Sequence, residues 1–181
     1  RAGHIWHLDM IEFRYRSEEG CKYLLVLTDE TTQFYQLIPL YWKSDAPYEL
    51  ERWIRHMRRH PAFINLEYQM IAQIITDNES VWNDDASKWK QVLDKVGGLE
   101  MVYAPPEDHA RVNARAEGSN KIIEAGIQSI LFEQNLPPSW WQRACSDVMF
   151  LANRFPPYGN EANIPPDQDR ASPIEQLFQG Y

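Results

Sequence analysis

Three apolar segments lie close together at the start of the chain, and their order limits the folds that the rest can complete. They are residues 4–13, 22–31 and 32–40, and the middle one, "KYLLVLTDET", is a dense apolar run typical of a central strand. Strands that follow one another this closely pair most readily in antiparallel fashion. The sequence therefore predicts that the domain begins with a three-stranded antiparallel meander.

Helices and strands alternate after this meander. Leu50, Trp53, Ile54 and Met57 repeat at helical spacing and form one apolar stripe, with Pro61 beyond the helix end. The remaining predicted elements are strands at 69–76 and 99–106 and helices at 84–98, 110–134 and 137–156. This order predicts an α/β fold in which helices flank a five-stranded mixed sheet.

The length and composition of the chain indicate one domain with a tail. The 181 residues are 44% hydrophobic, which is enough for a sizeable core. We expect this core to span residues 1–156 and the Pro-rich extension at 157–181 to be extended chain. The sequence does not begin with Met, so we expect a fragment of a longer protein. No apolar run is long enough for a transmembrane helix, so we expect no membrane partner.

The charge of the chain argues against a general nucleic-acid-binding protein, because such proteins are usually basic and this net charge is −8. A local basic surface remains open, since residues 52–60 read "RWIRHMRRH". The two cysteines lie far apart and the five histidines are scattered. The sequence therefore predicts neither a disulfide framework nor a zinc site.

Three acidic residues fall where the predicted fold could bring them together. Asp9 lies on the first strand, Asp77 follows the fourth strand, and Glu117 lies early on the long helix. First and fourth strands can be neighbours in a mixed sheet, and the helix can carry the glutamate over them. Such oxygen ligands suit Mg²⁺, and a pair of ions can assist phosphoryl transfer. Simpler interpretations stay open: Asp77 as a turn or helix cap, and Glu117 as part of a solvated helix face.

Several segments resemble the integrase catalytic core of copia-like LTR retrotransposons. They are "WHLDMI" (6–11), "YLLVLTDETTQFYQLIPL" (23–40), "TDNESVW" (76–82), "VNARAEGSNKIIEAG" (112–126), "LPPSWWQRACSDVMFLANRFP" (136–156) and "SPIEQLFQG" (172–180). Each motif alone is short, but together they occur in the family's order and span nearly the whole chain.

The resemblance implies a ribonuclease-H-like fold and a metal-dependent polynucleotidyl transferase that trims DNA 3′ ends and joins them to target DNA. Its catalytic and metal-binding triad would be Asp9, Asp77 and Glu117, with two Mg²⁺ or Mn²⁺ ions in the active complex. The residues that would contact DNA are Arg111, Asn113, Arg115, Asn120 and Lys121. The implied partners are element ends, target DNA and further copies in a homodimer or higher oligomer. The implied location is the nucleus, with a cytoplasmic phase in virus-like particles.

The chain departs from the family pattern at several positions. Glu79 replaces a glycine, Val112-Asn113-Ala114 replaces a Q-N-G turn, and Gly118-Ser119 replaces a basic pair. Asp77 and Glu117 are also 40 residues apart (117 − 77), which exceeds the usual spacing. These departures keep open a non-catalytic, domesticated core that serves as a DNA-binding or dimerisation module. A ribonuclease H or bacterial-type transposase of the same fold is a third hypothesis, which the C-terminal segments disfavour.

Two expectations concern surfaces. We expect Arg52 and Arg55 to share one positive DNA-binding surface with Lys121 and the other basic residues of the long helix. We expect Trp140 and Trp141 to pack in the core or to provide apolar surface for a dimer.

Overall fold

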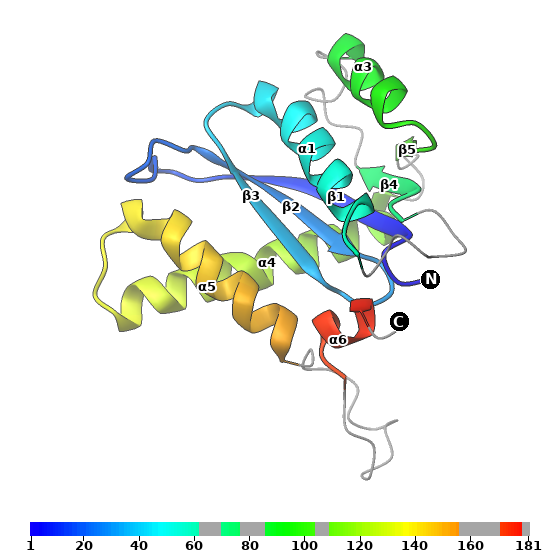
Figure 1. The fold of residues 1–181 in the computed structure, drawn as a ribbon. Coiled ribbons are helices and arrows are strands. Elements are labelled where there is room, and N and C mark those ends of the chain that lie inside the picture. Colours follow the sequence, from blue (N-terminus) through cyan, green and yellow to red (C-terminus); the bar gives the residue numbers. More distant parts are fainter. Residues whose placement is uncertain (62–69, 77–85, 104–108, 156–170, 179–181) are drawn as a thin grey trace.

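The computed structural model describes residues 1–61, 70–76, 86–103, 109–155 and 171–178, and for 86, 87, 90 and 109–116 the helical backbone alone. Its centre is a five-stranded mixed sheet with the strand order β3-β2-β1-β4-β5 (Figure 1). The strands are β1 (Ile5–Glu12), β2 (Tyr23–Asp29), β3 (Tyr35–Leu40), β4 (Gln73–Thr76) and β5 (Glu100–Tyr103). The predicted α/β fold class is confirmed.

Strand β1 lies at the centre of the sheet and joins its two halves. It pairs with β2 in antiparallel fashion and with β4 in parallel fashion. The other two pairings follow the same division, because β2–β3 is antiparallel and β4–β5 is parallel. The predicted meander is therefore correct, and so is the expectation that the first and fourth strands are neighbours.

Helices cover both faces of the sheet (Figure 1). They are α1 (Ala46–Arg58), α3 (Ala86–Val96), α4 (His109–Glu133), α5 (Trp141–Arg154) and α6 (Pro173–Phe178), with short 3₁₀ turns at Lys43–Asp45 and Pro138–Trp140. Helices α1 and α3 lie on one side, and α4 and α5 lie on the other. In the described part of the chain, no helix combines the length and apolar character that crossing a bilayer requires.

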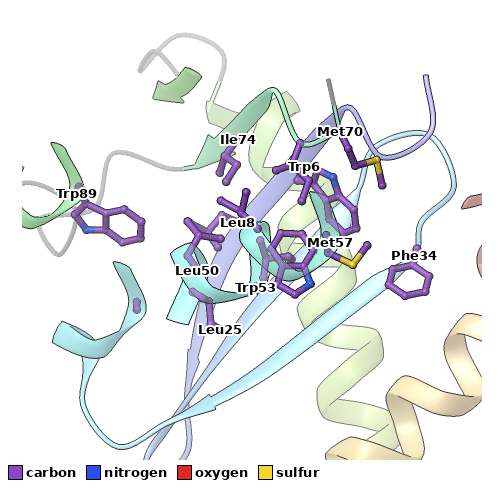
Figure 2. Packing of buried hydrophobic residues seen from close by; sticks show 14 of the residues in the cluster. Trp6, Leu8, Leu25, Phe34, Leu50, Trp53, Met57, Met70, Ile74 and Trp89 are labelled. Atoms are coloured by element: carbon purple, nitrogen blue, oxygen red, sulfur yellow. The ribbon is translucent and has the colours of Figure 1, made fainter. Parts of the chain in front are cut away.

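The face beneath α1 carries the larger apolar core (Figure 2). Trp6 and Leu8 from β1 point to this face because alternate residues of a strand share a side. The predicted apolar stripe of α1 meets them, and the ring of Trp53 packs edge-on against Trp6 with centroids 4.8 Å apart. Burial of the stripe explains why α1 forms where the sequence predicts it.

The opposite face buries the intervening strand residues against α4 and α5. Ile11 from β1 and Val26 from β2 contact this second cluster, which also contains Ile123 and Ile127 of α4. Trp141 is 1% exposed and stacks on Phe13 with ring centroids 4.0 Å apart. Trp141 therefore belongs to the core of its own chain and offers no surface to a dimer partner.

The C-terminal extension is not wholly extended chain, so that part of the prediction is wrong. The short helix α6 begins with a capping box, in which Glu175 accepts hydrogen bonds from the backbone N–H and hydroxyl of Ser172. Its apolar side packs into the core beneath α1, where Leu177 is buried. The division into a core at 1–156 and an extension at 157–181 stays a prediction.

Most arginines of the basic segment 52–60 form ion pairs or hydrogen bonds within the chain. Arg52 and Arg55 pair with Glu49 and Glu51 at 2.8 and 2.9 Å. Helix α1 also lies on the opposite face of the sheet from α4. The expectation that Arg52 and Arg55 share one surface with Lys121 is therefore wrong.

Arg58 has a structural role that the sequence did not reveal. Its guanidinium donates hydrogen bonds of 2.7–3.0 Å to four backbone carbonyl oxygens. These oxygens belong to Met70, Ile71, Val96 and Gly97. Burial lowers the pKa of Arg58 from its usual value. Arg58 thus ties α1 to the segment before β4 and to the C-terminal end of α3.

Candidate active site

The candidate site lies where β1 and β4 run side by side. Leu8 pairs with Thr76, the last residue of β4, so the next position along β1 is Asp9. The position that follows Thr76 in the sequence is Asp77, which lies outside the described residues. Parallel neighbours bring their C-terminal ends to the same edge of a sheet. The strand arrangement that the acid hypothesis requires is therefore present.

Asp9 projects toward α4, and both of its carboxylate oxygens accept hydrogen bonds. Oδ1 accepts the backbone N–H of Met10 at 2.7 Å. Oδ2 accepts Nδ2 of Asn120 at 2.6 Å. These bonds orient the carboxylate and connect β1 to α4 directly at the candidate site.

Glu117 lies on α4 one turn before Asn120 and is exposed. Residues three apart on a helix share a side, so Glu117 and Asn120 face in the same general direction. Since Asn120 contacts Asp9, this spacing brings Glu117 to the same end of the site. The structure thus places Asp9 and the Glu117 segment together, and it does not describe Asp77.

Asn120 carries a second feature of interest. Its Oδ1 atom is buried and has no hydrogen-bond donor among the described residues. A buried acceptor without a partner is costly, so such atoms call for a specific explanation. Here the unpaired oxygen lies on the residue that contacts Asp9, which is consistent with a site built to receive a cation or a donor group.

The predicted DNA contacts have different surroundings. Lys121 is exposed on α4, next to Asn120. Arg111, Asn113 and Arg115 lie in the part of α4 that is described as backbone alone. Asn120, also predicted to contact DNA, donates a hydrogen bond to Asp9 within the chain. The sequence analysis missed this hydrogen bond, although the three-residue spacing from Glu117 was the signal that could have indicated it.

Gly118 and Ser119, which stand where the resembling family has a basic pair, do not both point to solvent. Ser119 is 6% exposed, and its hydroxyl is hydrogen-bonded to the phenol of Tyr35. Burial raises the pKa of that phenol, and the Ser119 bond partly offsets the effect. Gly118 has open space around the position of a Cβ atom. The serine is thus used in packing α4 onto β3, which gives it a role unrelated to DNA charge.

A second acid on the sheet, Asp29, is fully buried and serves the fold. Its Oδ1 accepts the N–H of Gly3 at 2.7 Å, and its Oδ2 accepts the N–H and hydroxyl of Thr32 at 2.8 Å. Burial raises the pKa of Asp29, while these bonds oppose the rise. Asp29 therefore holds the β2–β3 turn and the N-terminal segment and takes no part in the candidate site.

The donor set at the site suits a hard divalent cation. Carboxylate and amide oxygens, as on Asp9 and Asn120, are the ligands that Mg²⁺ prefers. Within the described ranges, no group of three or more His, Cys, Asp or Glu side chains forms a metal cluster. Because Asp77 lies outside those ranges, that result does not test the predicted triad.

Comparison with known proteins gives matches in structure and none in sequence. No family model and no curated protein matches the chain. A chain of the simian T-cell lymphotropic virus intasome, in complex with PP2A regulatory subunit B56 gamma, aligns with a TM-score of 0.69 and 15% identity over 96% of this chain. The match covers 54% of that intasome chain, so this chain spans about half of its length.

The catalytic core domain of HTLV-2 integrase, solved in complex with magnesium, matches in two forms. The trimeric form aligns with a TM-score of 0.64 and 14% identity, covering 98% of this chain and 97% of that one. The dimeric form aligns with a TM-score of 0.59 and 15% identity, covering 84% and 88%. At such low identity the likeness concerns architecture. This chain therefore has the ribonuclease-H-like fold of integrase catalytic cores.

Proposed function

We propose that the chain is the catalytic core of an integrase, a metal-dependent polynucleotidyl transferase that processes DNA 3′ ends and joins them to target DNA. The observation that carries the proposal is the hydrogen bond between Asn120 and Asp9. It joins the helix of Glu117 to the strand beside β4, and Asp77 follows β4 in the sequence. The integrase-core fold and the sequence resemblance to copia-like integrases support the same function.

In this proposal Asp9, Asp77 and Glu117 would hold two Mg²⁺ or Mn²⁺ ions. When bound, the ions would activate the attacking oxygen and stabilise the leaving oxygen. The attacking group in strand transfer is a DNA 3′-hydroxyl, and in end processing it is water. The chain supplies no covalent nucleophile: its role is to fix the carboxylates, and Asn120 orients that of Asp9. Lys121, exposed one turn after Glu117, would contact a DNA phosphate.

DNA ends and target DNA are the partners that this function requires, and a homodimer or higher oligomer is the expected assembly. The related cores were solved in trimeric and dimeric forms, which supports oligomerisation in general terms. Integration into chromosomal DNA would place the protein in the nucleus, after a cytoplasmic phase in virus-like particles.

A second function is a non-catalytic core retained for DNA binding or dimerisation. The net charge of −8 and the loss of the basic pair after Glu117 favour it. The packing of Ser119 against Tyr35 weakens the second argument, because that position is buried in this chain. The two functions differ in one property, which is turnover of DNA in the presence of a divalent metal.

A strand-transfer assay on the full-length protein with Mg²⁺ or Mn²⁺ tests the proposal. Asp9→Asn should abolish product and leave the fold intact, because the Asn120 amide can rotate to present its oxygen to the new amide group. Asp94→Asn makes the same change on an exposed position of α3 and should retain activity. A parent protein that folds and binds DNA but yields no product would support the non-catalytic function instead.

A further inference from the structure

A small pocket lies beside the candidate active site, between α4, the C-terminal end of β2 and the start of β3. It has a volume of about 200 Å³. Such a volume is below the roughly 300 Å³ at which pockets for drug-sized ligands begin, so the pocket suits a group of one or two rings. The lining residues that matter here are Thr28, Gln33, Tyr35, Gly118, Ser119 and Ile122.

The pocket reaches the surface along a row of α4 that lies next to Glu117. Glu117 and Lys121 are one turn apart and both are exposed. Gly118 and Ile122 form the adjacent row, one residue further along the helix. Ile122 is 55% exposed, so the pocket is open to solvent on this side. A DNA strand that lies along Glu117 and Lys121, as the proposed function requires, would therefore pass the mouth of the pocket.

Gly118 leaves the mouth of the pocket unobstructed. Among the described residues outside its own helical turn, no atom lies within 4 Å of the place that a Cβ atom would take. A larger side chain would therefore meet open space instead of protein atoms. Because Gly118 lines the pocket, that side chain would narrow the pocket and leave the packing of α4 unchanged.

The pocket offers hydrogen-bonding groups that the described residues do not use. Thr28 is 4% exposed, and its hydroxyl has no hydrogen-bond partner in the described part of the chain. A buried hydroxyl without a partner is costly, which calls for an explanation. The side-chain amide of Gln33, an exposed residue with a φ of 60°, also bonds no described residue. A ligand with both donors and acceptors would satisfy these two groups.

The charge of the lining argues against two common kinds of ligand. None of the described residues that line the pocket is Lys, Arg or His, so a phosphate group would find no cation there. Asp29 is the acid of this lining, and both of its oxygens already accept hydrogen bonds from Gly3 and Thr32. A metal ion would have to break those bonds. An uncharged polar ligand avoids both difficulties.

We propose that this pocket binds a nucleobase that has left the DNA strand lying along Glu117, an inference that rests on the proposed function. A base is an uncharged, planar ring system with donors and acceptors along its edge. The Gln33 amide would pair with that edge, as glutamine does with N6 and N7 of adenine, and the Thr28 hydroxyl would add a bond. Ile122 would contact the face of the ring.

The base concerned is one that is already unpaired, as at a frayed DNA end. Removing a paired and stacked base from a duplex costs a few kcal/mol, whereas an unpaired base avoids most of this cost. An apolar side chain of a protein partner fits the pocket less well, because it would leave the Thr28 and Gln33 groups without partners. Water alone could satisfy those groups, and the experiments below distinguish that outcome.

The first experiment uses the full chain without metal and deoxyadenosine as the probe, followed by saturation-transfer NMR of the probe. Signals should appear on the base protons, whereas deoxyribose phosphate, which lacks the base, should give none. Gly118→Leu should abolish the signals, and Ser129→Leu, the matched change at another exposed position of α4, should retain them. Gln33→Ala should weaken binding about fivefold, while Gln128→Ala should leave it unchanged.

The second experiment places the base in DNA. The probe is a duplex with an unpaired 2-aminopurine at one end and fluorescein at the other. On addition of the parent chain, 2-aminopurine fluorescence should change saturably. Gly118→Leu should still bind the duplex, as read by fluorescein anisotropy, and should lose the 2-aminopurine response.

Strand transfer by the parent is measured separately, so that the two proposals can fail independently. A parent that is inactive but binds deoxyadenosine through Gly118 and Gln33 would support the pocket and contradict the catalytic function. An active parent that binds no deoxyadenosine would overturn the pocket alone and assign it to water. Equal binding by the parent and Gly118→Leu would also overturn the inference, because the base would then lie elsewhere.

Discussion

Asn120 on α4 and Asp9 on β1 are joined by a hydrogen bond of 2.6 Å, which fixes the helix that carries Glu117 to the central strand of the sheet. The bond uses the donor side of the asparagine amide, and the described residues offer no donor to its buried oxygen. The Asp9 carboxylate and the Asn120 amide oxygen, with Glu117 one helical turn before Asn120, are the kinds of group that a divalent cation would bind. The first prediction concerns a substitution that removes the hydrogen bond between Asn120 and Asp9.

Asn120→Asp should destabilise the metal-free protein at neutral pH by about 1–3 kcal/mol, because a hydrogen bond is replaced by repulsion between two carboxylates. Addition of Mn²⁺ should restore most of this loss, because a cation screens the pair. Chemical denaturation with and without metal measures both effects. Gln128→Glu is the matched control, since it adds the same charge at an exposed position of α4. Equal effects in the two variants would mean that Asn120 has no special relation to Asp9.

Arg58→Met should lower the free energy of unfolding by about 2–4 kcal/mol, because four backbone carbonyl oxygens lose a charged donor. Arg59→Met removes the same functional group from the neighbouring exposed position and should change stability by no more than about 0.5 kcal/mol. Urea denaturation of the two variants measures the difference. Similar stabilities would show that the Arg58 contacts do not hold α3 and β4 in place.

Asp29 should make the stability of the protein depend on pH in a direction unusual for a carboxylate. Its folded-state pKa is raised by burial above the ordinary value of 3.8, so the folded state binds the proton more tightly than the unfolded state. The stability that this group contributes is therefore present below pH 3.8, the ordinary pKa, and is lost as pH rises through the folded-state pKa.

Asp29→Asn removes this pH dependence and at the same time costs a hydrogen bond. Each Asp29 oxygen accepts a backbone N–H, so the new amide nitrogen must face a donor. We expect a loss of about 1–3 kcal/mol at neutral pH. The difference in stability between parent and variant should shrink as pH rises above the ordinary value. Denaturation curves measured from pH 4 upward check the slope, and a difference that grows with pH would contradict the assignment.

The thiol of Cys145 should be unreactive in the folded protein. Burial raises its pKa to about 12, and the Cys21 pKa is also raised by burial, so neither side chain supplies thiolate at neutral pH. Iodoacetamide at pH 8 should label neither cysteine in native protein and both in denaturant, as read by intact mass. Rapid native labelling of Cys145 would show that the α4–α5 core opens readily.

Local patterns were sufficient to predict most of the fold. The apolar stripe of α1 and the dense run of β2 each specify a buried face, and the structure uses both. Gly97 and Gly98 follow the last residue of α3 with positive φ values of 64° and 60°, as is common at helix C-termini. Helix α6 was missed because the prolines around it indicated extended chain, while its capping box lies within only a few residues.

Long-range contacts could not be predicted in the same way. The bond from Asn120 to Asp9 joins residues 111 positions apart, and nothing in the neighbourhood of either residue specifies it. Arg58 looked like part of a basic surface because its charge is visible in the sequence, whereas its carbonyl partners are not. The strand order that puts β4 beside β1 is likewise a property of the whole chain. The acids were identified by their places in the predicted elements and by resemblance, and the fold shows that β1, β4 and α4 lie together.

The most direct test of the central claim is a thermal melt of the parent and Asp77→Asn with and without Mn²⁺. If Asp9, Asp77 and Glu117 form one metal site, a saturating concentration of metal should stabilise the parent by about 3 kcal/mol, or about 6–12 °C in Tm. Asp77→Asn should melt at the parent's metal-free temperature or slightly above it, because one charge of a repelling pair is gone, and Mn²⁺ should not raise it. Equal shifts in both proteins, or no shift in the parent, would contradict the account.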